Sequence, residues 1–166
     1  MHMPKSFPDP TPCNWSRQEV QSFAADAAKK LGYQPGDEVE KVVEMLGGRV
    51  ELTDFASAAN TGSITVYGPE DFVIALSPLA GSGRSRFTMA HELGHYVLHS
   101  KLGKIPLQVR RDGSGRTEWE ANWFAAGFLM PEEEIRTKIA EGWGNAELAE
   151  HFGVSEAAIE VRRKAL

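Results

Sequence analysis

The sequence predicts an α+β fold, with a small antiparallel sheet of about three strands packed on a helical core and a helical tail at the C-terminal end. Two observations lead to this prediction. Apolar residues recur at helical spacing over most of the chain, whereas between residues 49 and 76 they alternate as in half-buried strands. With 166 residues and 42% hydrophobic content, the chain is long enough for one well-packed domain.

Composition places this domain among ordinary cytoplasmic proteins. The net charge is −5 and there is a single cysteine, so no disulfide framework is expected and a reducing compartment suits the chain. No signal peptide is visible, and no apolar run approaches the roughly 20 residues that a transmembrane helix needs. We therefore expect no membrane role.

The chain divides into three predicted parts. Residues 1–15 are rich in proline and lack periodicity, which predicts a flexible arm. Residues 16–142 form the main domain. Residues 143–166 have the sequence pattern of a helix-turn-helix, and we expect these C-terminal helices to pack on the same domain.

The first half of the main domain supplies two helices and the sheet. Ser16 and Glu19 form a capping-box pattern at the start of the first helix, which is predicted to run to about residue 31, and a second helix is expected over about 37–46. The edge strand of the sheet either binds an extended peptide or only supports the helix that follows, and both interpretations stay open. The predicted strands are residues 49–52, 63–67 and 72–76.

The segment from Arg86 to His99 contains the candidate catalytic residue and two candidate metal ligands. It contains H-E-L-G-H, an HExxH pattern, on a predicted helix. His91 and His95 lie four residues apart and therefore share one helix face, where both imidazoles can hold one metal ion. Glu92 between them can act as a general base. The same face, which also holds Glu92, lacks the lysine, arginine and several glutamates expected of a solvated helix face.

A zinc site of this kind needs a third protein ligand and leaves the fourth position to water. The segment from Thr117 to Pro131 is apolar nearly all round, which predicts a buried helix ended by Pro131. Thr117 and Glu120 form a capping-box pattern, which gives Glu120 a structural role. Glu118 points with the inward face, and a buried carboxylate needs a partner such as a metal. Glu118 is the predicted third ligand, and Glu120 is the alternative.

Two separated motifs agree in order with one known family. They read Phe87-Thr88-x-Ala90-His91-Glu92-Leu93-Gly94-His95 and Glu118-x-x-Ala121-Asn122-x-Phe124-Ala125-Ala126-x-x-Leu129-Met130-Pro131. With these motifs the chain resembles the ImmA/IrrE family of metallo-endopeptidases. The resemblance implies a zincin-like core in which His91, His95 and Glu118 bind Zn²⁺ and Glu92 is the catalytic base. It also implies that Asn122 orients a liganding histidine. Mn²⁺ or another divalent metal suits the same ligands.

The glycine-rich segment 100–116 joins the two motif helices, so its ends should flank the metal. It is either a lid or specificity loop, with Arg110, Arg111 and Arg116 favouring acidic substrate groups, or a disordered surface loop. His99 is expected to support the site or end the helix rather than bind the metal. Tyr96, His99 and the arginines of this segment are candidate donors to an anionic intermediate.

Two further segments have alternative interpretations. Cys13 either places its thiolate on the metal or is an unremarkable free thiol. In the tail, Gly153 is the predicted turn and Ser155 the N-cap of the last helix. That helix starts with Glu156 and Ala157, where a DNA reader needs groups for phosphates and base edges. Direct DNA binding is therefore not expected, and packing or substrate contact is preferred.

These features predict a zinc-dependent metallo-endopeptidase that cleaves a specific cytosolic protein. The resemblance implies that this substrate is a helix-turn-helix transcriptional repressor or an antitoxin, cleaved to switch on stress or mobile-element genes. The alternative is a non-catalytic, metal-stabilised regulator or toxin–antitoxin component that acts by protein binding. A structural zinc site usually has four protein ligands, and only three are predicted here, which favours catalysis.

Overall fold

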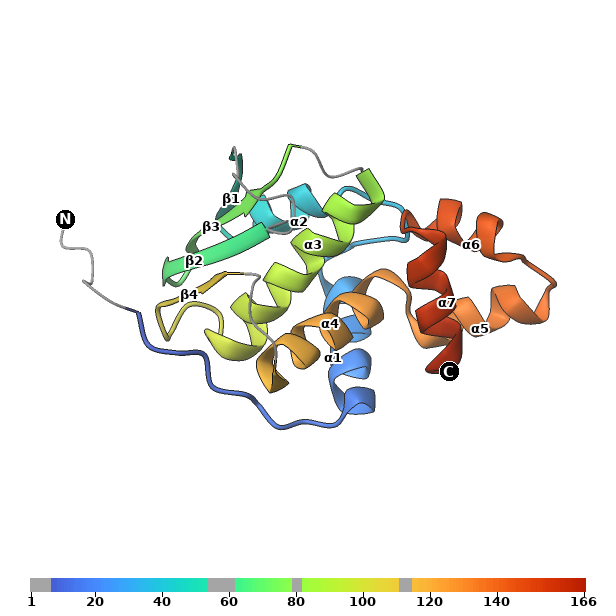
Figure 1. The fold of residues 1–166 in the computed structure, drawn as a ribbon, viewed down its shortest axis with the longest axis horizontal. Helices are drawn as coiled ribbons and strands as arrows, with labels where there is room; N and C mark the ends of the chain where they lie inside the picture. Colours follow the sequence, from blue (N-terminus) through green and yellow to red (C-terminus); the bar gives the residue numbers. More distant parts are fainter. Residues whose placement is uncertain (1–6, 54–61, 79–81, 111–114) are drawn as a thin grey trace.

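A four-stranded sheet and a set of helices make up the computed structural model, which describes residues 7–53, 62–78, 82–110 and 115–166 (Figure 1). The predicted α+β class is confirmed. In chain order the elements are α1 (Arg17–Lys30), α2 (Val39–Met45), β1 (Gly48–Leu52), β2 (Gly62–Gly68), β3 (Asp71–Leu76), α3 (Ser82–Gly94), the π-helical η1 (His95–His99), β4 (Leu107–Arg110), α4 (Arg116–Leu129), α5 (Glu132–Ala140), α6 (Asn145–Phe152) and α7 (Glu156–Lys164).

The sheet has the strand order β1-β3-β2-β4. β2 pairs antiparallel with β3 and with β4, whereas β1 pairs parallel with β3, so the sheet is mixed. The sequence predicts about three antiparallel strands, and the additional strand, β4, lies within the segment predicted as a lid or surface loop. Alternation shows which side chains face the core, but it carries no information on strand direction, and four residues are too few for a clear pattern.

One face of the sheet is buried against helices. In β2 and β3 every second side chain is buried, and α3 packs on these two strands. α3 in turn lies between the sheet and α4, and α1 packs on α4 (Figure 1). The motif helix is therefore held in the centre of the fold. The sheet side chains in this core are Ile64, Val66, Phe72, Ile74, Leu107 and Val109.

Two glycines allow α4 to approach its neighbours closely. A Cβ atom at Gly94 of α3 would lie 3.0 Å from the Cβ of Phe124, and one at Gly127 of α4 would lie 2.5 Å from the carbonyl oxygen of Gln21 in α1. Because interiors are close-packed, larger residues at these positions would push the helices apart. The close approach of α3 and α4 brings the two motifs together.

Arg86 connects the C-terminal helices to the rest of the chain by hydrogen bonds. Arg86 of α3 donates to the carbonyl oxygens of Gly36 and Asp37 and, at 2.6 Å, to that of Gly153 between α6 and α7. As predicted, Gly153 adopts a left-handed conformation with φ 70°, and the Ser155 hydroxyl caps α7. The proposed division into arm, main domain and tail stays a prediction. Within the described residues, no helix has the length and apolar character needed to cross a bilayer.

Candidate metal centre

The HExxH motif spans the junction of α3 and η1. His91 and Glu92 belong to the last turn of α3, and His95 begins η1, where the backbone N–H of Ser100 donates to the His95 carbonyl oxygen at 2.9 Å. All three side chains are buried. Such π-helical turns are rare and often occur at functional sites. Here the turn brings the Nδ1 atoms of His95 and His99 to 2.9 Å from each other.

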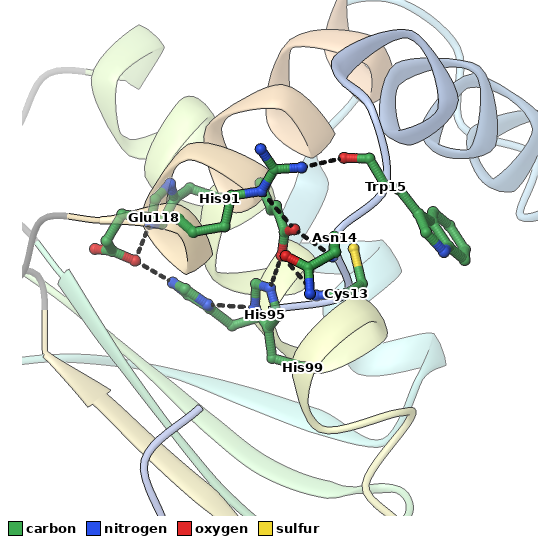
Figure 2. Close-up of polar contacts among 9 residues, drawn as sticks. Cys13, Asn14, Trp15, His91, His95, His99 and Glu118 are labelled. Atoms are coloured by element: carbon green, nitrogen blue, oxygen red, sulfur yellow. Dashed lines mark hydrogen bonds and ion pairs between the residues drawn. The ribbon is translucent and has the colours of Figure 1, made fainter. Parts of the chain in front are cut away.

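Glu118 approaches these histidines from the first turn of α4. Its Oε2 atom lies 3.4 Å from His91 Nε2 and 2.6 Å from His95 Nε2, and Figure 2 shows its carboxylate between the two rings. Three donors that bind one zinc ion at about 2.0–2.1 Å in tetrahedral geometry are separated from one another by about 3.3 Å. The His91–Glu118 separation equals this value within 0.1 Å, whereas the His95–Glu118 contact is about 0.7 Å shorter, so a metal ion fits between the three side chains once His95 and Glu118 move slightly apart.

The chemical state of these donors also suits a metal. Within the described residues, His91 Nε2, His95 Nε2 and Glu118 Oε2 are buried and contact one another, with no hydrogen-bond partner outside this group. Burial lowers the pKa of His95 to about 4, which keeps the imidazole neutral and its lone pair available. Burial raises the pKa of Glu118, but the neighbouring imidazoles outweigh this and hold the pKa well below its ordinary value. Neutral imidazoles and a carboxylate are the forms that bind zinc.

Glu92 lies beside the ligand set and is fully buried. Its Oε1 atom is 3.7 Å from His91 Nε2, and donor atoms of His91, Glu92 and His95 all lie within 4.8 Å of one another. This position is close enough for Glu92 to exchange protons with a molecule held at the centre. The structure therefore brings together the four residues that the sequence predicts as ligands and base.

Asn122, one turn after Glu118, contacts the first histidine. Its Oδ1 atom lies 2.8 Å from His91 Nδ1. An amide oxygen only accepts, so His91 carries its proton on Nδ1 and presents the Nε2 lone pair towards Glu118. This contact is the one that the predicted orienting role of Asn122 requires.

A longer chain of contacts orients the second histidine (Figure 2). His95 Nδ1 lies 2.9 Å from His99 Nδ1, and His99 Nε2 lies 2.8 Å from Glu120 Oε1. A carboxylate accepts, so His99 donates from Nε2 and its Nδ1 accepts the proton of His95 Nδ1. His95 Nε2 is thereby left free to bind a metal. Burial lowers the pKa of His99, which is consistent with this neutral tautomer.

Glu120 anchors that chain at its outer end. Its carboxylate also accepts from the backbone N–H of Cys13 at 2.9 Å and of Asn14 at 2.8 Å, and from Arg116 Nε at 3.1 Å. Burial raises the pKa of Glu120, but these hydrogen bonds, led by that from His99, lower it to about 2. Glu120 is ionised at neutral pH and faces His99 rather than the ligand set. The alternative assignment of Glu120 as the third ligand therefore does not fit.

The predicted capping box of Thr117 and Glu120 is wrong. α4 begins two residues earlier than a Thr117 cap requires, at Arg116, with Gly115 at the N-cap and no side-chain cap. Thr117 is therefore already inside the helix, and Glu120 is free to bond across the fold. The sequence does contain a signal for the contact between Glu120 and His99. It has a second carboxylate in a largely apolar helix and a third histidine, His99, after the HExxH motif. By contrast, the Ser16 and Glu19 capping box is confirmed.

The remaining candidates lie away from the ligands or outside the described residues. Tyr96 is buried, stacks on Phe72 with ring centroids 4.0 Å apart, and its hydroxyl donates to the Leu102 carbonyl oxygen, so it faces the sheet. Arg110 is exposed at the end of β4, and Arg111 falls outside the described residues. Burial raises the pKa of the Cys13 thiol, which does not favour a thiolate on the metal.

Comparisons with known proteins agree with this arrangement. The sequence model of the IrrE N-terminal-like domain, Peptidase_M78, matches residues 43–164, a range that contains the whole candidate centre. Among solved structures, a Mycobacterium tuberculosis transcriptional regulator is similar with a TM-score of 0.62 and 19% identity, over 87% of this chain and 46% of that chain. At this identity the likeness shows the fold alone, and the chain spans about half the length of that regulator. No curated protein matches the chain.

Proposed function

The chain belongs to the IrrE N-terminal-like domain family, Peptidase_M78, and we propose that it is a zinc-dependent endopeptidase. One observation carries the proposal. Three ligand atoms converge: Glu118 Oε2 lies 3.4 Å from His91 Nε2 and 2.6 Å from His95 Nε2. The buried Glu92 lies beside them. Three ligands leave one coordination position for chemistry, whereas a structural site is usually closed by four.

The roles of the side chains follow from their positions. When bound, the metal supplies a Lewis acid that polarises a peptide carbonyl and makes water a better nucleophile. Glu92 accepts a proton from the attacking water and returns it to the leaving nitrogen, because it is the carboxylate next to the ligand set that has no ligand role. Asn122 and the His99–Glu120 pair hold the two imidazoles in the tautomers that bind metal.

The sheet offers a place for the substrate backbone. β4 forms an edge of the sheet, since among the described strands it pairs only with β2. The chain that leaves β4 leads to the first turn of α4, which carries Glu118. We infer that an extended segment of a protein substrate adds to this edge by backbone hydrogen bonds. The family resemblance supports a helix-turn-helix repressor or an antitoxin as that substrate.

The test uses Glu92→Gln, which removes the base but no ligand. The zinc-loaded chain should make one specific cut in the repressor encoded beside its gene, and chelation of zinc should abolish the cut. Glu92→Gln should bind zinc as the unmodified chain does and fail to cut. Cleavage by Glu92→Gln would refute the role of the base. Binding of the repressor without any cut would instead indicate the non-catalytic regulator.

A further inference from the structure

A groove of about 750 Å³ opens beside the candidate metal centre, between α1, α3, α4 and α7. Its connection to the centre is direct, because Asn122 is part of its wall and bonds His91 at 2.8 Å. Thr88, one turn before Glu92 in α3, lines it as well. A molecule in this groove therefore lies next to the site where we propose that cleavage occurs, and the inference below rests on that proposed function.

The walls of the groove are largely apolar. Trp119 is 55% exposed and Val161 is 69% exposed, and both face this space together with the partly buried Phe87 and Trp123. Exposed tryptophan is a costly feature on a protein surface and is enriched where partners bind. These side chains fit an aromatic or aliphatic group of a ligand.

The charged side chains that line the groove, among the described residues, are all positive. Arg17, Arg84 and Arg162 line it, and no aspartate or glutamate does so among the described residues. The chain as a whole has a net charge of −5, so this positive lining is a local departure. None of the three arginines is within ion-pair distance of a described carboxylate, and Nη2 of the buried Arg162 has no hydrogen-bond partner there. Clustered arginines favour an anionic ligand, above all where, as for Arg17 and Arg84, no described carboxylate lies within ion-pair distance.

Arg162 also borders a second cavity, lined by Glu132, Glu133 and Glu134, so its charge is shared between the two spaces. Arg17 and Arg84 line only the first. Both are exposed, which leaves their guanidinium groups free to contact a ligand at the groove. The positive character relevant to binding therefore comes chiefly from these two side chains.

We propose that this groove binds a segment of the protein substrate in which an aromatic or aliphatic side chain is flanked by carboxylates. The apolar side chain packs against Trp119 and Trp123, and the carboxylates pair with Arg17 and Arg84. Arginine and tryptophan also suit single-stranded nucleic acid. A peptide is favoured because the groove adjoins the proposed centre for peptide hydrolysis.

Binding is measured with the full-length, zinc-loaded Glu92→Gln chain, so that bound peptide is not cut. The probes are two fluorescein-labelled ten-residue peptides, one with Phe between two Glu and one with Phe between two Lys. Fluorescence anisotropy should show about tenfold tighter binding of the acidic peptide, since complementary charge discriminates between partners. Arg84→Glu should abolish this preference. Trp119→Ala should weaken binding of both peptides about tenfold.

Matched controls lie outside the groove. Arg163→Glu reverses a neighbouring exposed charge on α7, and Phe23→Ala removes an exposed aromatic ring from α1. Neither should change the affinity by more than about twofold. Equal binding of the two peptides, or insensitivity to both Arg84→Glu and Trp119→Ala, overturns the proposal. Tighter binding of a labelled twelve-residue oligothymidylate, lost in the same two variants, overturns it in favour of nucleic acid.

The two proposals fail separately. If the unmodified chain cuts no repressor but Glu92→Gln binds the acidic peptide through the groove, the groove stands and the peptidase proposal fails. If the chain makes its specific cut at the same rate with and without Arg84→Glu and Trp119→Ala, the peptidase stands and the groove fails. Both substitutions are at exposed positions, so circular dichroism should show an unchanged fold.

Discussion

Replacement of Glu120 by glutamine tests whether the outer carboxylate controls the metal centre. The glutamine keeps one acceptor oxygen for His99 and Cys13 N–H, but its NH₂ group would face the donors of Asn14 and Arg116. Two hydrogen bonds to a buried carboxylate are lost, each worth about 1.5–3 kcal/mol, so the free energy of unfolding should fall by about 3–6 kcal/mol. Loss of the negative charge weakens the hydrogen bond that holds the His99 ring against His95, which should lower zinc affinity about 10–100-fold.

The assay is a zinc titration in competition with a chromophoric chelator, followed by cleavage of the repressor at saturating zinc. Because the ligands and Glu92 are untouched, saturating zinc should restore most of the cleavage rate. Glu19→Gln is the control, since Glu19 is an exposed carboxylate that also accepts from a backbone N–H, at Ser16. Its zinc affinity should equal that of the unmodified chain.

Two results would refute this reasoning. Unchanged zinc affinity in Glu120→Gln would show that the His99–Glu120 contact does not support His95. Normal zinc affinity combined with lost cleavage at saturating zinc would show that Glu120 acts on the reaction and not on the ligand. Rescue of zinc affinity by Glu120→Asp, which keeps the charge, would support the positioning role.

Three further predictions concern stability. The pKa of Glu120 is about 2 in the folded chain against an ordinary value of 4.5, so its stabilising contribution is complete above about pH 4.5 and is lost as the pH falls towards 2. Between pH 7 and pH 3.5, urea unfolding should therefore show a larger fall in unfolding free energy for the unmodified chain than for Glu120→Gln. Gly127→Ala should lower the Tm by roughly 5–10 °C because its new Cβ meets backbone, whereas Gly68→Ala, with nothing within 4 Å, should change it little. Arg86→Met should cost about 2–3 kcal/mol of unfolding free energy by removing bonds to three carbonyl oxygens, whereas Arg49→Met, which loses one exposed ion pair, should cost no more than about 0.5 kcal/mol. Equal effects of each substitution and its control would contradict these accounts.

The parts of the candidate site that the sequence predicts are those set by local geometry. His91 and His95 are one helical turn apart, so the spacing alone places them on one face. The sequence favours Glu118 as the third ligand but leaves Glu120 as the alternative, because both carboxylates belong to the buried helix and only the structure shows which histidine each one contacts. Helix boundaries are predicted within one or two residues at α1 and α4, since the Ser16–Glu19 capping box of α1 and Pro131 after α4 are local signals.

What the sequence did not predict depends on distant partners. Glu120 bonds to Cys13 and Asn14, which precede it by 107 and 106 residues, and no local pattern reports such a contact. The π-helical turn at His95–His99 was missed because a 3.6-residue period was assumed throughout. The parallel pairing of β1 with β3 depends on the path of the chain between strands, which alternation does not encode.

The arm reaches Glu120 through backbone amides rather than side chains. Amide donors are common to every amino acid except proline, so evolution can replace the side chain at position 13 without losing the contact. Fewer residue types suit position 14, because its φ of 61° favours asparagine, aspartate or glycine. The family match starts at residue 43, well after this segment. This anchor for Glu120 therefore depends on the backbone of residues 13 and 14, which lie outside the matched range, and not on the side chain at position 13.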